Sequence, residues 1–366
     1  MSGSVSARFG AARVVFVLAV VCVASVGLVG PASAHGGSTI VRPGESIQDA
    51  IDGASPGDRI VVRAGNYAEQ LTIETDGIDL VGRGAILSPP ELPVDNPCSG
   101  LAGEGTQAGI CVTGADVELA PFVVEHRKVS SVGRRVEDVS ITGFQVRGFS
   151  GENIAVLGAQ DARITRNKLT DGEQYGFLTA GSINTRVTGN TVESSTTLRF
   201  IGICMDNVSG VQVSNNHISG YNVALCVQTP GADVRNNDVS ASCIGAFVDP
   251  FIDGAKIHHN HISAVNPLCA TASDFGAFGV ILDGAVNTDV RQNRIEGQTL
   301  RDAFAAGIAV VDDPPTTTPV AVASGNVVTQ NILRNNDLDL LVATVGTGNV
   351  IAGNKCTTPK ELCTGK

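Results

Sequence analysis

The sequence predicts an all-β protein, namely a parallel β-helix with three strands in each coil. The first observation is a short phrase in which apolar and polar residues alternate before an asparagine, and an apolar residue follows two positions later. Alternation of this kind predicts short strands. The phrase occurs eight times, and we call its asparagine the pivot asparagine: Asn167, Asn190, Asn216, Asn237, Asn260, Asn293, Asn331 and Asn354.

The spacing of the phrases is the second observation. Most pivot asparagines follow one another at 21 to 26 residues, with two longer steps of 33 and 38. Such a period predicts a solenoid, in which each repeat packs only on its neighbours. We expect each pivot asparagine to take the left-handed backbone conformation of a sharp bend and to bond through its amide to the next coil.

A second apolar segment before each phrase is the third observation, and it supplies the third strand of the coil; 202–206 is an example. With these repeats, residues 38–356 resemble the right-handed parallel β-helix repeat proteins, the superfamily of pectate lyases and polygalacturonases. The resemblance implies a right-handed, single-stranded β-helix with a substrate cleft along the strand before each pivot asparagine. Lyases, hydrolases, epimerases and non-enzymes share the phrase, so the resemblance predicts the fold and leaves the reaction open.

Residues 1–34 have the pattern of a secretory signal peptide. Arg8 and Arg13 precede an apolar stretch at 14–29, and Ala32-Ser33-Ala34 forms a small-residue cleavage site. The remaining residues, 35–366, are predicted to form one β-helix domain, with a cap at about 38–60 and coils at about 60–356. The expected location is therefore extracellular, with no membrane attachment after the signal is removed.

The cap is expected to contain a short helix. Ser46 and Asp49 have capping-box spacing, and Ile47 and Ile51 share one helical face with two alanines. Coil strands are then expected at 60–62, 71–73, 78–81, 110–112, 122–124 and 139–146. Loops are expected at 88–110, which is rich in proline and glycine, and at 312–319.

The formal net charge of −11 argues against nucleic acid and anionic membrane as partners. It suits a soluble extracellular protein, which we expect to be a monomer. The chain has no Trp and only 3 Tyr, although polysaccharide clefts favour aromatic platforms.

Eight cysteines remain once Cys22 leaves with the signal, and an even number in a secreted chain predicts disulfides. Cys204 and Cys226 occupy equivalent positions on adjacent coils, so a bond between them is expected. Position along the chain suggests three further pairs: Cys243–Cys269, Cys98–Cys111 and Cys356–Cys363. Zinc binding is the alternative, but the sequence has no Cys-x-x-Cys motif.

Acidic residues gather on one predicted strand face. If Ile203 and Met205 point inward, the outward column on successive coils contains Leu157, Ala180, Asp206, Gln228, Asp249 and Asp283, followed by Asp312 or Asp313. Asp249 and Asp283 would lie about 5 Å apart at the backbone. Two such carboxylates either share a proton, which suits acid–base cleavage of a glycosidic bond, or bind Ca²⁺ together with Asp312. The plain alternative is a solvated acidic edge.

A second column follows the pivot asparagines and contains His217, Asp238 and His261. It could bind a metal, or it could be a ladder of complementary charges on a solvated face. The functional prediction uses the first column. We expect a secreted protein that binds or modifies an extracellular polysaccharide as a lyase or a hydrolase does. Its predicted catalytic residues are Asp206, Asp249 and Asp283, and calcium is a possible cofactor. The alternative is a non-catalytic structural or adhesion module.

Overall fold

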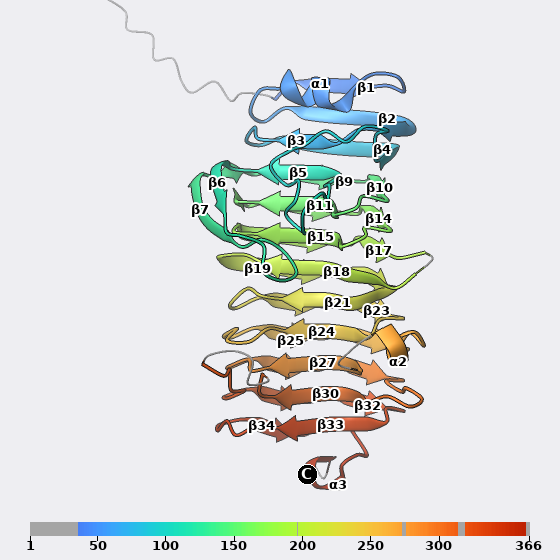
Figure 1. Ribbon diagram of the computed structural model, residues 1–366, viewed down its shortest axis with the longest axis vertical. Coiled ribbons are helices and arrows are strands. Elements are labelled where there is room, and N and C mark those ends of the chain that lie inside the picture. Colours follow the sequence, from blue (N-terminus) through green and yellow to red (C-terminus); the bar gives the residue numbers. More distant parts are fainter. Residues whose placement is uncertain (1–35, 196, 273–275, 314–318, 364–366) are drawn as a thin grey trace, which may run out of the picture. The chain divides into compact units, whose positions relative to one another are not determined.

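The computed structural model describes residues 36–195, 197–272, 276–313 and 319–363, and nearly all of their regular structure is β-strand (Figure 1). These residues belong to one compact unit that begins at His35. The predicted signal peptide, 1–34, and the middle of the predicted loop, 314–318, lie outside the described residues. The assignment of 1–34 as a signal and of 35–366 as one domain therefore stays a prediction.

One strand of each coil belongs to a ten-stranded parallel sheet, in which neighbours in the sheet are also successive coils of the chain. Its strands are β3 (Leu71–Ile73), β5 (Ile110–Thr113), β11 (Glu152–Leu157), β15 (Tyr175–Ala180), β18 (Arg199–Asp206), β21 (Tyr221–Val227), β24 (Ile244–Val248), β27 (Ala277–Asp283), β30 (Ala305–Val311) and β33 (Leu338–Ala343).

The other strands of the coils form a 22-stranded parallel sheet. They are β1 (Ser38–Val41), β2 (Arg59–Ala68), β4 (Asp79–Ser88), β8 (Val136–Glu137), β9 (Ser140–Thr142), β10 (Gln145–Arg147), β12 (Ala159–Gln160), β13 (Arg163–Thr165), β14 (Lys168–Thr170), β16 (Ile183–Thr188), β17 (Thr191–Glu193), β19 (Ser209–Ser214), β20 (His217–Ser219), β22 (Asp233–Arg235), β23 (Asp238–Ser240), β25 (Lys256–His258), β26 (His261–Ser263), β28 (Asp289–Arg291), β29 (Arg294–Glu296), β31 (Val327–Thr329), β32 (Ile332–Arg334) and β34 (Val350–Ala352). A coil such as β15–β16–β17 thus has three strands, and the predicted parallel β-helix is confirmed.

Helix α1 (Ile47–Asp52) covers the first coils, as predicted (Figure 1). The Ser46 side chain accepts a hydrogen bond from the Asp49 backbone, and Ile47 and Ile51 are buried against the core. Glu69 accepts from the backbone of Ile47 at 3.0 Å, which adds a negative charge at the helix start. Two further one-turn helices, α2 (Cys269–Ala272) and α3 (Lys360–Cys363), lie after β26 and β34.

The pivot asparagines form one continuous buried row. From Asn167 to Asn331, each donates its backbone N–H and its side-chain N–H to the Oδ1 atom of the next, over 2.9–3.2 Å. The second side-chain N–H donates to a carbonyl of the preceding coil, as from Asn237 to Val213 at 3.0 Å. The predicted stacking of the asparagines is therefore confirmed.

The expected backbone conformation of the pivot asparagines is wrong. The left-handed residue is the one immediately before the asparagine, with φ of 56° at Asn215, 53° at Asn236 and 57° at His259. The bend therefore precedes the pivot residue. This leaves the asparagine backbone free to pair with the next coil in ordinary strand geometry.

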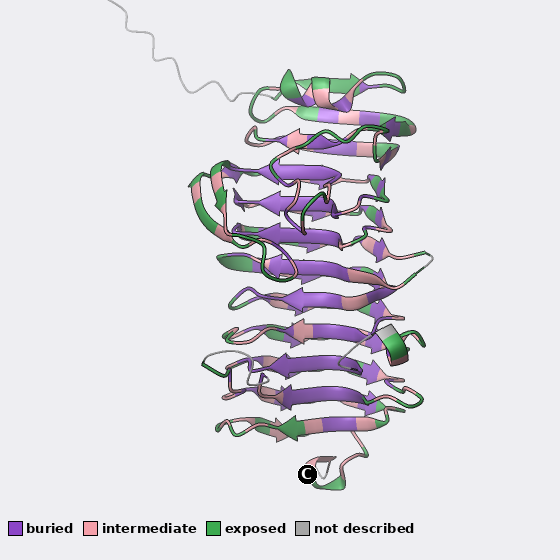
Figure 2. Ribbon diagram, viewed as in Figure 1, coloured by how far each residue is buried: buried purple, intermediate pink, exposed green. Residues whose placement is uncertain are grey.

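The ten-stranded sheet has the register expected from the sequence. Ile203 and Met205 belong to the main core inside the coils, whereas Cys204 belongs to a separate apolar cluster on the outward face. Figure 2 shows that these strands are buried along most of their length. Burial on both faces means that another part of the chain covers the sheet from outside.

Over the coils from β5 to β21, part of that cover is a hairpin which leaves the coils between β5 and β8. Strands β6 (Ala115–Leu119) and β7 (Val129–Arg134) pair antiparallel, and their side chains Val117, Leu119 and Val129 pack on the outward cluster. The prediction of a coil strand at 122–124 is wrong, since these three residues form part of the exposed connection between β6 and β7. We call this connection, residues 120–128, the cover segment.

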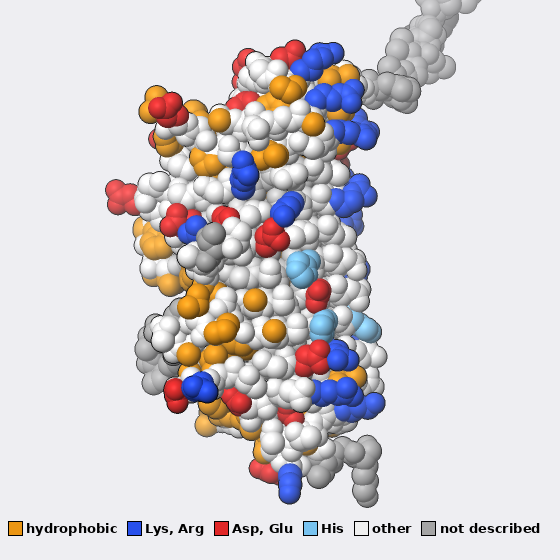
Figure 3. All heavy atoms as spheres, turned by 90° about the vertical axis from the view of Figure 1, so that its right-hand side faces the viewer, with side chains coloured by type: hydrophobic (Ala, Val, Ile, Leu, Met, Phe, Trp, Pro, Cys, Tyr) orange, Lys and Arg blue, Asp and Glu red, His pale blue; other side chains and the backbone are white. Residues whose placement is uncertain are grey.

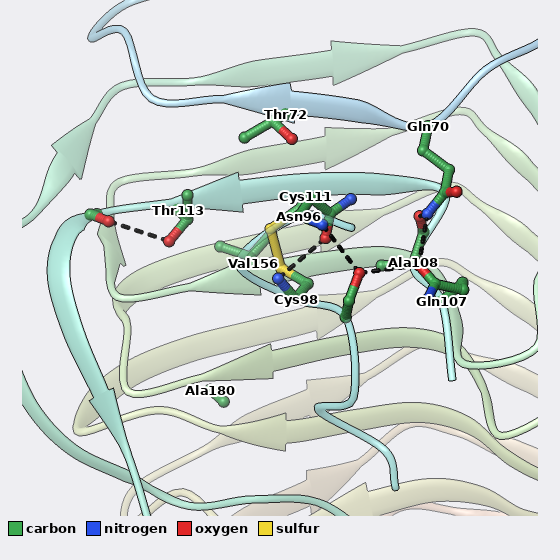
Figure 4. Close-up of a disulfide and its surroundings, with 12 residues drawn as sticks. Gln70, Thr72, Asn96, Cys98, Gln107, Ala108, Cys111, Thr113, Val156 and Ala180 are labelled. Carbon is green, nitrogen blue, oxygen red and sulfur yellow. Dashed lines mark hydrogen bonds between the residues drawn. A yellow bond between two sulfur atoms is a disulfide. The ribbon is translucent and has the colours of Figure 1, made fainter. Parts of the chain in front are cut away.

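Three of the predicted disulfides are present: Cys98–Cys111, Cys243–Cys269 and Cys356–Cys363. Figure 4 shows the first of them tying the loop before β5 to the outward face of that strand. The predicted bond between Cys204 and Cys226 is wrong, because both thiols are free. They are directly paired on parallel strands, which holds their Cβ atoms near the strand spacing of about 4.8 Å, wider than the roughly 3.8 Å of a disulfide.

Candidate functional site

Three polar side chains of the predicted outward column lie on consecutive coils. Asp206 ends β18, Gln228 follows β21 and Asp249 follows β24, and the strand register places all three at equivalent positions. Leu157 and Ala180 continue the column on the preceding coils. The column that the sequence predicts therefore exists.

The cover segment brings two basic side chains to Asp206. The Nε2 atom of His126 lies 3.0 Å from the Oδ2 atom of Asp206, and Lys128 Nζ donates to the same oxygen at 3.1 Å. His126 is buried, whereas about half of the Lys128 side chain is exposed. Burial lowers the pKa of Lys128, but the charge of Asp206 outweighs it and leaves the pKa raised, so Lys128 remains a cation at neutral pH.

Gln228 connects the cover segment with Asp249. Its Oε1 atom accepts from Lys128 Nζ at 2.5 Å, and its Nε2 atom donates to Asp249 Oδ2 and to Glu125 Oε2, each at 2.6 Å. Since both oxygens lie this close to one nitrogen, they are no more than about 5 Å apart. The amide thus holds two carboxyl groups side by side.

Asp249 differs chemically from an ordinary surface aspartate. Burial raises its pKa well above its usual range, and the negative charge of Glu125 raises it further, although Gln228 and Lys128 act in the opposite direction. Its Oδ1 atom is inaccessible to solvent and has no hydrogen-bond partner among the residues that the structure describes. Asp249 therefore holds a proton at a pH at which most aspartates have lost theirs.

Further titratable groups lie behind this cluster. The Nδ1 atom of His126 lies 3.2 Å from the Tyr175 hydroxyl, and Tyr175 pairs across the strands with the completely buried Glu152. Burial raises the pKa of Glu152 to about 8. Burial also raises the pKa of the Cys204 thiol to about 11, so that it is neutral and a poor nucleophile.

Asp283 follows Asp249 in the outward column and has acidic neighbours of its own. Burial raises its pKa to about 6, and the charges that raise it further are those of Asp313 and Asp312. By contrast, the charges that act on Asp249 come from Glu125, Lys128 and Asp206. The strand register pairs Val248 with Leu282 and so places Asp249 and Asp283 on adjacent coils, as predicted, while Glu125 of the cover segment adds a further carboxylate beside Asp249.

The predicted calcium ligands are not placed to bind one ion together. Asp312 uses both carboxylate oxygens in the structure, accepting from Ala323 and Val345 backbone N–H groups at 2.9 Å each, and from the Thr344 hydroxyl. Over the described parts of the chain, no group of three His, Cys, Asp or Glu side chains is placed to hold a metal ion. Asp249, Asp283 and Asp312 therefore do not form the predicted site.

Glu125, His126 and Lys128 are the site residues that sequence reasoning missed. They are 78 to 103 residues from the column residues they contact. One signal was available, since Glu-His-Arg-Lys at 125–128 is a run of charge in a stretch that does not fit the repeat. The cover segment also lines a hollow of about 710 Å³ through Phe122 and Arg127, and Asp95 and Glu104 line the same hollow.

The second predicted column is a ladder of charges. Asp238 bonds to His217 at 3.1 Å and to His261 at 2.9 Å, and His261 bonds onward to Glu296 at 3.1 Å. Each histidine therefore faces a carboxylate on the adjacent coil. Such pairs on an exposed face support the strand register and require no metal.

Comparisons with known proteins agree with this architecture. Residues 201–361 match the family described as right handed beta helix region, and residues 101–266 match the family described as periplasmic copper-binding protein (NosD). No curated protein matches the sequence. Within the described residues, no helix has the length and apolar character needed to cross a membrane.

Solved structures share the fold at low sequence identity. The DFA-IIIase from Arthrobacter chlorophenolicus A6 without its lid is 14% identical, with a TM-score of 0.50 over 82% of this chain and 86% of that chain. The alginate lyase from Paenibacillus sp. str. FPU-7 is 14% identical, with a TM-score of 0.45 over 87% of this chain and 96% of that one. The family 28 exopolygalacturonase of Yersinia enterocolitica is 14% identical, with a TM-score of 0.43 over 87% and 78%. The chain has the fold of the right-handed parallel β-helix proteins.

Proposed function

We propose that the protein is exported and hydrolyses a glycosidic bond of an extracellular polysaccharide at the outward edge of the ten-stranded sheet. The site consists of Glu125, His126, Lys128, Asp206, Gln228 and Asp249, which we call the Asp249 site. The observation that carries the proposal is the pair of carboxyl groups on one amide, of which Asp249 keeps its proton. Glycoside hydrolases use such a pair, with one carboxyl as acid and the other as base or nucleophile.

The chemistry divides between the two carboxyl groups. Asp249 donates its proton to the leaving-group oxygen as the glycosidic bond breaks, while the Glu125 carboxylate attacks the sugar carbon. Water then releases the sugar from Glu125 and returns a proton to Asp249. The short separation, no more than about 5 Å between the bonded oxygens, suits the retaining mechanism, in which the carboxyl groups stand about 5 Å apart.

Two features favour hydrolysis over elimination by a lyase. A lyase needs a neutral base, yet Lys128, the lysine of the Asp249 site, has a raised pKa and stays protonated. The three carboxylates expected to hold Ca²⁺ are not gathered into a site. Lys128 and Asp206 instead hold the cover segment in place. Their charged groups lie at the edge of the Asp249 site, where they can bind the hydroxyl groups of a sugar.

Export is part of the proposal. Three disulfides bridge the described residues, and such bonds persist in oxidising compartments. The signal-like pattern at 1–34 agrees with this compartment. Periplasmic and extracellular locations both satisfy these observations.

The test is a screen of neutral and uronate polysaccharides, in which new reducing ends and unsaturated products are measured separately. We expect new reducing ends without unsaturated product. Asp249→Asn and Glu125→Gln should each lower turnover by at least a hundredfold, because each removes one of the two reacting groups. Asp289→Asn is the control, since it changes an aspartate on β28 in the other sheet, and it should retain wild-type turnover. Unsaturated product, or equal turnover in Asp249→Asn, would contradict the proposal.

A non-catalytic binding or structural role is the second candidate, and the cover segment is the observation that favours it. The contacts of His126 and Lys128 with Asp206 attach the cover segment to the sheet, which is a purely structural role. In that case no polysaccharide would be cleaved, and Glu125→Gln would change only the stability of the fold.

A further inference from the structure

A basic hollow lies on the 22-stranded sheet, whereas the Asp249 site lies on the ten-stranded one. Its volume is about 570 Å³, and the charged residues that line it are Arg59, Asp79, Arg83, Arg163 and Arg166. Figure 3 shows Lys and Arg side chains stacked along one edge of the upper coils. Four arginines beside one aspartate make a strongly positive surface in a chain whose formal net charge is −11.

The hollow results from the residues that neighbouring coils place at equivalent positions. On β9 and in the bend after it, the lining residues are Ser140, Thr142 and Gly143, which are all short. The strand register pairs Ser140 with Arg163 on the next coil, and one step after the end of this pairing Gly143 corresponds to Arg166. The middle coil therefore forms a low floor between longer side chains on the coils at either side.

Two of the four arginines have no carboxylate partner. Arg59 and Arg163 each form an ion pair with an aspartate, over 3.5 and 2.9 Å. Arg83 and Arg166 are exposed, and they form no ion pair with any residue that the structure describes. On lower coils of the same sheet, by contrast, the arginines of β22 and β28 each pair with an aspartate of their own strand. Charge pairing between strands therefore does not account for Arg83 and Arg166.

We propose that this basic hollow binds a phosphate monoester with a hydroxylated body, such as a sugar phosphate. A phosphate monoester carries between about 1.5 and 2 negative charges at pH 7, so it matches the two unpaired charges of Arg83 and Arg166. A single carboxylate would match only one of them. Guanidinium groups also bind phosphate oxygens through two parallel hydrogen bonds. A hollow lined mainly by charges of one sign raises the local concentration of an oppositely charged ligand.

The rest of the lining suits the body of such a ligand. The hydroxyl oxygens of Thr142 and Thr165 lie 2.8 Å apart, so one hydroxyl donates to the other and the accepting one has its own hydrogen for a ligand. Ser140 adds a third hydroxyl to the lining. The volume of about 570 Å³ exceeds that of one phosphate group and lies in the usual range for pockets that bind small organic molecules. The expected ligand is therefore larger than inorganic phosphate and polar.

The test measures binding of glucose 6-phosphate, inorganic phosphate and glucose to the full chain by calorimetry at low ionic strength. We expect glucose 6-phosphate to bind more tightly than inorganic phosphate, and glucose not to bind. Arg83→Gln and Arg166→Gln should each weaken the binding of glucose 6-phosphate by about tenfold, because each removes hydrogen bonds between a guanidinium and the phosphate. The double variant should abolish binding. Both side chains are exposed, so the fold should remain intact.

Arg334→Gln is the matched control. It removes the same charge from an exposed arginine on β32, outside the hollow, so the affinity for glucose 6-phosphate should not change. The measurement is independent of the proposed hydrolysis, because it needs no turnover at the Asp249 site. Equal affinity in wild type and the double variant would overturn the proposal. Glucose or inorganic phosphate that binds as tightly as glucose 6-phosphate would overturn it as well.

Discussion

The buried carboxyl groups show how strongly position changes one side chain. Glu152 lies paired with Tyr175 under the outward cluster, and neither of its oxygens has a hydrogen-bond partner within the part of the chain that the structure describes. Burial alone accounts for a pKa of about 8 in place of its ordinary 4.5. Asp249 is less completely buried but has a negative neighbour, Glu125, and this combination suits it to proton transfer.

The pKa of Glu152 predicts how the stability of the protein depends on pH. The folded state binds one more proton than the unfolded state between pH 4.5 and about 8, so the free energy of unfolding falls as pH rises through this range. The shift corresponds to a loss on the order of 5 kcal/mol. In Glu152→Gln this part of the loss should disappear, because the amide does not titrate.

Chemical unfolding at pH 5 and pH 8.5 measures this difference. Glu118→Gln, on the exposed strand β6, serves as control and should keep the wild-type dependence on pH. If Glu152→Gln and wild type lose the same stability between the two pH values, Glu152 is not the buried acid described here.

At the scale of single elements, the row of pivot asparagines determines which residues can replace them. Asn237 accepts from Asn216 and donates to both Val213 and Asn260, and it is buried. Asn237→Ala would leave buried partners unsatisfied on two coils. We expect a loss of about 2–4 kcal/mol in the free energy of unfolding.

Asn354→Ala tests the same contact at the end of the row. Asn354 accepts from Asn331, but no further pivot asparagine follows it in the sequence. Its replacement should therefore cost less than that of Asn237 in a denaturant titration. An equal cost at both positions would show that the row does not act as a chain of bonds.

The packing of the hairpin β6–β7 on the ten-stranded sheet predicts that two cysteine thiols are protected from solvent. Cys204 and Cys226 are free and buried in the outward apolar cluster, against which Val117 and Val129 pack. A thiol reagent should therefore label neither in the native protein and both after unfolding without reductant. Val129→Asp should expose them at native conditions, because a charge cannot remain in the apolar contact. Unfolded protein without reactive thiols would instead establish the Cys204–Cys226 disulfide.

At the scale of the whole molecule, the sequence was sufficient to predict the fold of the repeated coils. The eight coils from β11 onward repeat the same phrase, so the strand order, the inward positions and the asparagine row follow there from one local pattern. Three disulfides could also be predicted from the sequence, because their cysteines are near in sequence or lie after corresponding turns. Two features could not be predicted in this way, namely the left-handed residue before each pivot asparagine and the free thiol of Cys204. Both depend on details of backbone geometry that the sequence pattern does not contain.

The candidate site was only half predictable for the same reason. Asp206 and Asp249 come from the repeat, whereas Glu125, His126 and Lys128 come from an insertion without periodicity. The repeat predicts which residues lie at equivalent positions on adjacent coils. It does not predict where an inserted hairpin packs on those coils. The position of Asp283 beside Asp249 was therefore predictable, whereas the Glu125 carboxylate beside Asp249 was not.

The pKa of Asp249 tests the central claim most directly. A titration of aspartate carboxyl groups by carbon-13 nuclear magnetic resonance, with Asp249→Asn used to identify the signal, would measure it. We expect the Asp249 signal to titrate well above the ordinary value of 3.8, and to move toward that value in Glu125→Gln, because the neighbouring negative charge is then absent. A signal that titrates near 3.8 in both proteins would contradict the account of this site.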